Sequence, residues 1–201
     1  MTFAELSLLL NLQPDGVILL EGRRTISPED ALLATGTASL LAKRFPRARF
    51  RSGNATGSDE AFSKGIAQVD PSRLQVVAPY HGHRMKFRYE GAHYSSPVEM
   101  SILQDEEVAY RTIAATPKNR RLIEGRSGAG PLAAKARYLI RDTMKVTGHS
   151  AEFPAPVCAL FYVRLDDPME GGTGHTIRVC QQEAVPYAFQ DSWRLWAGEA
   201  K

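Results

Sequence analysis

Short apolar runs alternate with longer amphipathic stretches along the chain, and this pattern predicts its elements. Val17–Leu20 is a continuous apolar run between two glycines, which predicts a fully buried strand. Ser27 can cap the helix that follows, with Pro28 at its first position and acids in its first turn. Further strands are predicted at 50–52, 74–78, 157–163 and 185–189, and further helices at 60–68, 98–115, 132–146 and 177–183.

The order of these elements predicts the fold class. Strands that alternate with helices imply a parallel sheet with right-handed crossovers. We therefore predict an α/β protein, a Rossmann-like three-layer αβα sandwich with a mainly parallel sheet of about five to seven strands. We expect a single domain over residues 1–201, with an irregular or helical insertion at about 80–130 and little regular structure at 80–97.

Composition narrows the classes of partner. The formal net charge is +3, and no run of five or six Lys or Arg residues occurs, so we expect no dedicated nucleic-acid surface. No segment approaches the roughly 18 consecutive apolar residues of a membrane helix. Residues 1–12 lack the basic start of a signal peptide. We therefore expect a cytoplasmic protein that has neither nucleic acid nor a membrane as its partner.

Cysteine and histidine residues give no pattern typical of a metal site. Cys158 and Cys180 sit in apolar runs without a CxxC spacing, which favours buried thiols over a disulfide. His81, His83 and His93 have no nearby cluster of acids or cysteines. We therefore predict no metal site and name no cofactor.

Two segments, 52–59 and 171–176, share one architecture: a buried strand, a glycine-rich turn and a helix start. A helix start offers unpaired N–H groups and partial positive charge, and glycine lets a phosphate approach the backbone closely. We expect both segments at the carboxyl edge of the sheet, where ligands bind to doubly wound folds. The predicted ligand-binding residues are Arg23, Ser52, Gly53, Asn54, Gly57, Ser58, Gly171, Gly172, Thr173, Gly174, His175, Thr176 and Arg178.

The pair of motifs resembles the SLOG superfamily of Rossmann-like domains. This superfamily includes the LONELY GUY phosphoribohydrolases, the lysine decarboxylase-like proteins and the DNA-processing protein A family. Segment 53–59 is similar to its early S-G-G-x-x-G-x-D loop, with Asn54 at the second glycine, and segment 171–176 to its later G-G-x-G-T loop. The resemblance implies an arginine on the helix before the last motif, and Arg137 and Arg141 both qualify for this role. It also implies a homodimer.

One departure from that pattern concerns catalysis. The phosphoribohydrolases carry P-G-G-x-G-T-x-x-E, in which the Glu is catalytic. Here Glu170 stands at the proline, His175 at the threonine and Arg178 at the Glu. A cation cannot replace a carboxylate as a general base, whereas Arg178 on a first helical turn suits a phosphate.

We therefore expect the chain to bind a nucleotide or a related phosphorylated small molecule across the two loops. One alternative is an N-glycosidic hydrolase or transferase of nucleoside phosphates that uses another carboxylate, with Asp59, Glu170 and Arg141 as the candidate catalytic residues. A second alternative is single-stranded DNA binding like that of DNA-processing protein A.

Overall fold

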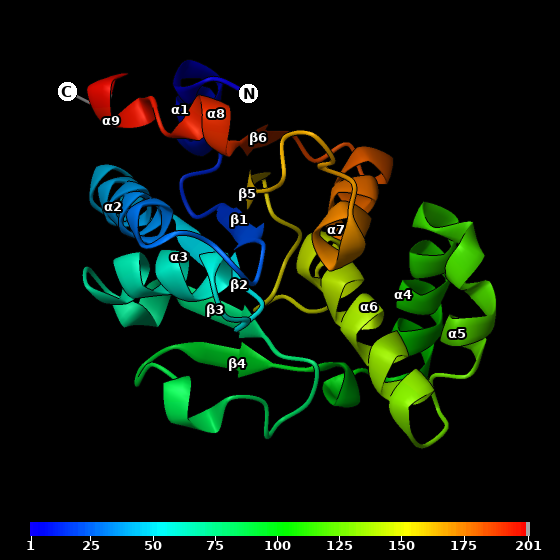
Figure 1. The fold of residues 1–201 in the computed structure, drawn as a ribbon. Coiled ribbons are helices and arrows are strands. Elements are labelled where there is room, and N and C mark those ends of the chain that lie inside the picture. The colour runs from blue at the N-terminus through cyan, green and yellow to red at the C-terminus, as the bar shows by residue number, and fades with distance from the viewer. Residues whose placement is uncertain (200–201) are drawn as a thin grey trace.

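The structure, a computed structural model, describes residues 1–199 as a three-layer α/β protein (Figure 1). One sheet of six strands has the order β4-β3-β2-β1-β5-β6, and every neighbouring pair is parallel. The strands are β1 (Val17–Gly22), β2 (Arg49–Ser52), β3 (Leu74–Val77), β4 (His93–Ser95), β5 (Cys158–Tyr162) and β6 (Tyr187–Phe189). The predicted Rossmann-like αβα fold is confirmed.

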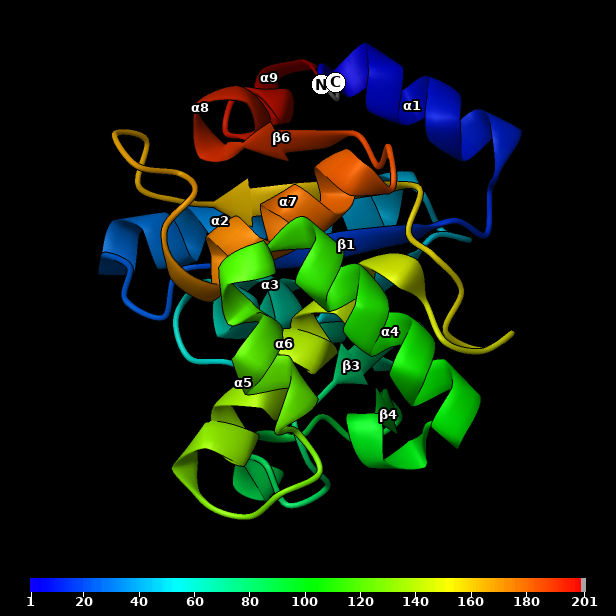
Figure 2. The same cartoon turned by 90° about the vertical axis from the view of Figure 1, so that its right-hand side faces the viewer.

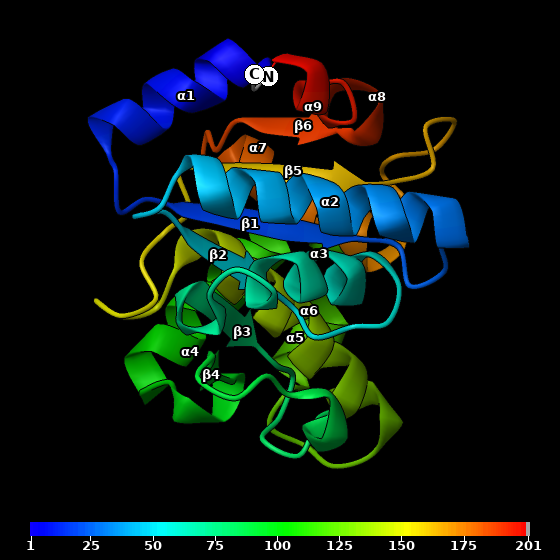
Figure 3. The ribbon, with the colours of Figure 1, turned by 90° about the vertical axis from the view of Figure 1, so that its left-hand side faces the viewer.

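Helices cover both faces of this sheet. On one face lie α2 (Pro28–Arg44) and α3 (Ser58–Ala67) (Figure 3). On the other lie α4 (Ile102–Ala115), α6 (Pro131–Thr147) and α7 (Gly171–Gln182), with α5 (Arg120–Glu124) outside α6 (Figure 2). The short helices α8 (Gln190–Trp193) and α9 (Trp196–Glu199) lie with α1 (Phe3–Leu12) beyond β6. Ser27 caps α2 by accepting a hydrogen bond from the Asp30 N–H, as its sequence predicts.

The central strand β1 separates two parts of the core. Its residues are all buried, and successive side chains point to opposite faces. Ile18 and Leu20 pack with the apolar side chains of α1, α2 and α3. Leu19 packs on the other face, with Phe161 of β5 and Ile177 of α7. Glu21 therefore also projects toward α6 and α7, because it follows Leu19 by two residues.

Helix α7 begins at Gly171, earlier than the predicted start at Ile177. The glycine-rich segment is thus the first turn of the helix and not a loop before it. The Gly174 N–H donates to the Glu170 carbonyl at 2.9 Å. A Cβ on Gly174 would lie 1.9 Å from the Met169 carbonyl oxygen, so only glycine allows the chain to enter the helix along this path.

The segment 80–97 has more regular structure than its sequence indicates. It contains β4, which extends the sheet at one edge by pairing with β3, and short 3₁₀ turns. An edge strand has a partner on one side only, so it does not need the apolar run that reveals a central strand. His93 is exposed and Tyr94 is half-buried, which explains why this strand escaped prediction.

The aromatic C-terminal segment packs on the domain. Trp193 and Trp196 are buried, and the Trp196 ring lies 5.9 Å from the Phe3 ring of α1. Within residues 1–199, none of the helices combines the length and the apolar character that crossing a membrane requires.

Both cysteines are buried and free, in agreement with the sequence. Burial raises the pKa of the Cys158 thiol to about 12 and also raises the pKa of the Cys180 thiol. Both side chains are therefore neutral, packed thiols.

Candidate functional site

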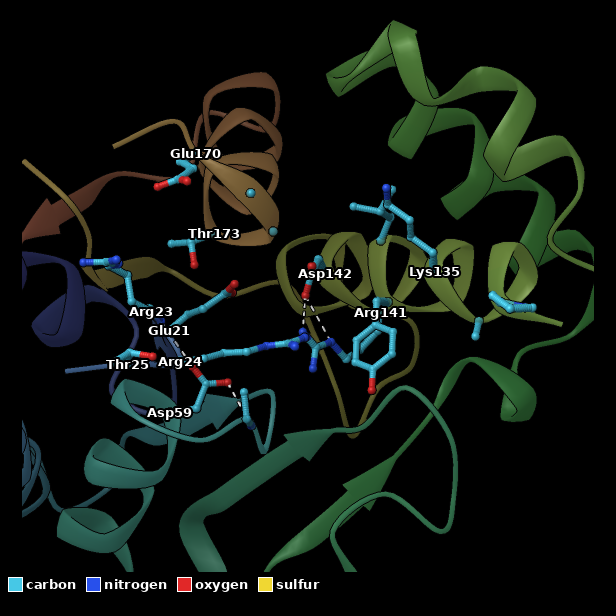
Figure 4. Close-up of a pocket in the computed structure, with 18 residues that line it drawn as sticks. Glu21, Arg23, Arg24, Thr25, Asp59, Lys135, Arg141, Asp142, Glu170 and Thr173 are labelled. Carbon is cyan, nitrogen blue, oxygen red and sulfur yellow. Dashed lines mark hydrogen bonds and ion pairs between the residues drawn. The ribbon is translucent and has the colours of Figure 1, made fainter. Parts of the chain in front are cut away.

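A cavity of about 760 Å³ opens at the carboxyl edge of the sheet, where the strand order reverses (Figure 4). There β1 lies between β2 and β5, and the connections leave in opposite directions. Such switch points are where doubly wound sheets bind ligands. The lining residues are Glu21, Gly22, Arg23, Arg24, Thr25, Ala55, Asp59, Pro131, Ala134, Lys135, Tyr138, Leu139, Arg141, Asp142, Glu170, Gly171, Gly172 and Thr173.

The first glycine-rich loop, between β2 and α3, is wrapped around a carboxylate of its own. Asp59 Oδ2 accepts hydrogen bonds from the Gly53 N–H at 3.1 Å and the Ala55 N–H at 3.4 Å. Asp59 Oδ1 accepts one from the Gly22 N–H at 3.2 Å. The Asp59 side chain therefore already fills the anion-binding position that these N–H groups create.

The rest of this loop holds the chain that leaves β1. The Ser58 N–H and hydroxyl both donate to the Arg23 carbonyl, at 3.0 and 2.9 Å. Gly57 has a φ of +76°, and a Cβ there would lie 2.4 Å from the Arg24 carbonyl oxygen. Of the predicted ligand residues in this part of the chain, Ser52, Gly53, Asn54, Gly57 and Ser58 lie outside the cavity lining. Their contact with a ligand stays a prediction.

The second glycine-rich segment faces the cavity directly. Gly171, Gly172 and Thr173 line it as the first residues of α7. The N–H groups of Gly172 and Thr173 lie in the first turn of α7, where the helix provides no carbonyl to accept their hydrogen bonds. No other acceptor within residues 1–199 binds them. The two segments therefore lie at the same edge of the sheet, but only α7 presents open N–H groups to the cavity.

The later residues of the second segment lie behind the cavity wall. His175 is buried, with its ring nitrogens 2.8 Å from the Thr116 hydroxyl and 3.1 Å from the Thr143 hydroxyl. Burial lowers the His175 pKa, so this ring is neutral. The other predicted ligand residues in and after this segment contact protein groups instead of the cavity. Gly174 packs against Met169, the Thr176 hydroxyl donates to Glu21, and Arg178 donates to the Met169 carbonyl.

A network of buried charges forms the floor of the cavity. Lys145, on α6, lies with its Nζ 2.5 Å from Glu21 Oε2 and 2.9 Å from Asp142 Oδ1. Arg141 Nη2 lies 2.6 Å from the same Asp142 oxygen, and Arg141 Nη1 donates to the Gly53 carbonyl at 2.9 Å. The network ties the end of β1, the helix α6 and the first loop together.

The two carboxyl groups that share Lys145 have pKa values displaced in opposite directions. Desolvation raises the pKa of Glu21 to about 7 despite the attraction of Lys145, and the charges of Asp142 and Asp59 add to the rise. Desolvation acts on Asp142 too, but Arg141 and Lys145 outweigh it and lower the Asp142 pKa. Two carboxyl groups separated in this way can act as proton donor and proton acceptor.

The candidate catalytic residues differ in their surroundings. Asp59 is held by backbone N–H groups, whereas Arg141 is buried in the floor. Glu170 is exposed at the rim, 3.3 Å from Arg164 Nη1. Sequence reasoning did not identify Glu21, Asp142 or Lys145, and catalysis by the residues it did name stays a prediction.

The mouth of the cavity is basic and has one aromatic wall. Arg23 and Arg24 are exposed after β1, and Lys135 is exposed on α6 (Figure 4). The Tyr138 ring lies near two guanidinium groups, 5.5 Å from that of Arg24 and 5.4 Å from that of Arg141. Arg23, Arg24 and Lys135 thus add positive charge at the mouth, and Tyr138 adds a flat apolar surface.

No protein-family model and no curated protein match the sequence. Among solved structures, the chain is similar to DNA processing protein A from Helicobacter pylori, in a study of its single-stranded DNA binding mode. The identity is 13% and the TM-score 0.47, over 89% of this chain and 67% of that chain. This likeness concerns the α/β Rossmann-like fold.

The same neighbour corrects our expectation that nucleic acid is not a partner, because it binds single-stranded DNA. The expectation relied on the small net charge, which does not report how charge is distributed. Arg84, Lys86 and Arg88 lie together in one short segment, in which Lys86 is exposed and the two arginines are partly buried. The homodimer implied by the resemblance stays a prediction.

Proposed function

We propose that this chain binds a phosphorylated, nucleotide-like small molecule in the switch-point cavity, with its phosphate at the start of α7. The observation that carries the proposal is the open first turn of α7, whose glycines leave the N–H groups accessible from the cavity. N–H groups at a helix start and the helix dipole both favour an anion. Membership of the SLOG superfamily is part of the same proposal, supported by the two glycine-rich segments.

The surroundings of the α7 start support this ligand class. Arg23, Arg24 and Lys135 provide positive charge at the mouth, and Tyr138 provides a ring against which a base can pack. The cavity volume of about 760 Å³ lies within the usual range for sites of small molecules and cofactors.

Native mass spectrometry of the purified protein, followed by calorimetric titration with nucleoside monophosphates, tests this proposal. We expect a phosphorylated adduct or saturable binding. Lys135→Glu should weaken binding by about fivefold to tenfold, because it places a negative charge at the mouth. Lys118→Glu makes the same charge change away from the cavity and should leave binding unchanged. Equal effects of the two variants, or no binding by wild type, would refute the site.

A second candidate function is binding of single-stranded nucleic acid at the segment 80–89. This segment interleaves basic and aromatic residues, and Tyr80 and Phe87 are 45% and 55% exposed. The guanidinium of Arg84 lies 4.4 Å from the Phe87 ring centroid. Exposed rings beside cations form the stacking surface that single strands use, without a requirement for sequence.

Fluorescence anisotropy with a labelled thymidine oligonucleotide tests this second function. The logarithm of the binding constant should fall linearly with the logarithm of the salt concentration. Phe87→Ala should weaken binding about tenfold, since stacking of one base contributes about 1–3 kcal/mol. The exposed Leu132, on α6, provides a matched apolar control as Leu132→Ala. If the binding constant changes neither with salt concentration nor with Phe87→Ala, segment 80–89 is not the binding surface.

A further inference from the structure

The two oxygens of Asp142 have different surroundings in the cavity floor. Its Oδ1 accepts two hydrogen bonds, from Arg141 Nε at 3.0 Å and Arg141 Nη2 at 2.6 Å, and forms an ion pair with Lys145 Nζ at 2.9 Å. Its Oδ2 accepts none within residues 1–199, although the side chain is only 4% exposed. Oδ2 is not sealed inside the protein but faces the cavity, so a ligand or a water molecule can donate a hydrogen bond to it.

The free oxygen points toward the start of α7. A Cβ built on Gly172 would lie 3.1 Å from Asp142 Oδ2, so a side chain at this position would press on the carboxylate. Asp142, labelled in Figure 4, and Gly172 both line the cavity. The vacant acceptor and the open N–H groups of α7 are therefore neighbours within one site.

An ionised carboxylate accepts hydrogen bonds and donates none. The charges of Arg141 and Lys145 lower the Asp142 pKa, so this group stays ionised at neutral pH. Beside a phosphate, its free oxygen repels further phosphate oxygens but binds a hydroxyl group strongly. The floor as a whole has the same preference, since it combines three carboxyl groups with two cations.

We propose that Asp142 Oδ2 is a sugar-hydroxyl subsite, which selects ligands that carry hydroxyl groups next to the phosphate held at α7. The inference rests on the proposed function, because it assigns the part of that ligand adjacent to the phosphate. The ligand class is a polyhydroxylated sugar phosphate, such as a ribose 5-phosphate unit, and not inorganic phosphate or an alkyl phosphate.

Two base-free probes test the subsite, ribose 5-phosphate and propyl phosphate. Wild type should bind ribose 5-phosphate about 10- to 100-fold more tightly than propyl phosphate, which is the range expected for one hydrogen bond to a charged group. Asp142→Asn keeps the volume and an acceptor for Arg141 and Lys145 but turns an NH₂ toward the cavity. It should weaken ribose 5-phosphate binding and strengthen propyl phosphate binding, because a negative charge near the anion is gone. Asp167→Asn, in the exposed loop before α7, is the matched control and should change neither.

The possible outcomes separate the two proposals. If both probes bind wild type equally, or if Asp142→Asn strengthens both by one factor, the hydroxyl subsite is wrong while phosphate binding stands. If neither probe nor any nucleoside monophosphate binds, both proposals fail. The comparison of the two probes on wild type decides the matter even if circular dichroism shows that Asp142→Asn does not fold.

Discussion

Asp59 should be essential for stability, because its carboxylate holds together the loops that follow β1 and β2. Asp59→Ala removes the acceptor of the Gly22 and Gly53 N–H groups, which are buried, and of the Ala55 N–H, which is partly exposed. Each buried donor left without a partner costs about 1–3 kcal/mol. The Ala55 bond is long, at 3.4 Å, so it adds little.

One opposing effect reduces this loss. Asp59 raises the pKa of Glu21 by repulsion, so its removal relieves part of the strain among the buried carboxyl groups. We therefore expect a net loss of about 3 kcal/mol in the free energy of unfolding, at the lower end of the range for such broken networks. For a chain of this size, that corresponds to a fall in Tm of about 10 °C.

Chemical denaturation followed by circular dichroism measures this loss. Asp59→Asn keeps the volume and one acceptor, and it should give an intermediate value. The adjacent Glu60 provides the control: its side chain is 43% exposed and pairs with Arg84 at 2.8 Å, so Glu60→Gln should cost less than about 1 kcal/mol. An Asp59→Ala protein within about 0.5 kcal/mol of wild type would show that the carboxylate does not hold the loops.

Three further predictions concern the floor and the α7 start. Gly174→Ala should cost about 3 kcal/mol or more in unfolding free energy, because its Cβ would lie 1.9 Å from the Met169 carbonyl oxygen. The control Gly36→Ala, in open space on α2, should instead stabilise the fold by about 0.5–1 kcal/mol. Equal denaturation midpoints of the two variants would contradict this. Lys145→Met should cost about 3–5 kcal/mol at pH 8, since two buried carboxylates lose their cation, and less at pH 5, where Glu21 holds a proton; the exposed Lys118→Met is the control. The pKa of Glu21 is raised from 4.5 to about 7, so the protonated side chain contributes about 3 kcal/mol to stability below pH 4.5, and this contribution is lost as the pH rises through 7. The unfolding free energy of wild type relative to that of Glu21→Gln should therefore fall between pH 4.5 and 7. A difference that stays constant with pH would argue against the raised pKa.

Local signals were sufficient to predict most of the fold. The apolar run at β1, the Ser27 cap with Pro28 and the long apolar run at β5 each mark their element in a few neighbouring residues. The start of α7 gave no such signal, because three glycines in its first turn have low helix propensity. Close packing of Gly174 on Met169, which is a tertiary contact, determines where the helix begins.

The sequence indicated the edge of the sheet at which the cavity lies, but not most of the residues that line it. The two glycine-rich segments do lie at one edge of the sheet, but the sequence could not show that Asp59 would occupy the first of them. Asp142 and Lys145 gave no signal in the sequence, since charged residues are rarely fully buried. One usable signal was Glu21, a charged residue that ends an otherwise apolar parallel strand.

Because both native cysteines are unreactive, a cysteine introduced at the cavity mouth can be labelled selectively. Cys158 and Cys180 are the two cysteines of the sequence, and burial keeps both thiols protonated and covered. Maleimide reagents therefore should not label the native chain. A cysteine introduced at Lys135 would be the single reactive thiol, so a fluorophore attached there could report occupancy of the cavity without any other change to the protein.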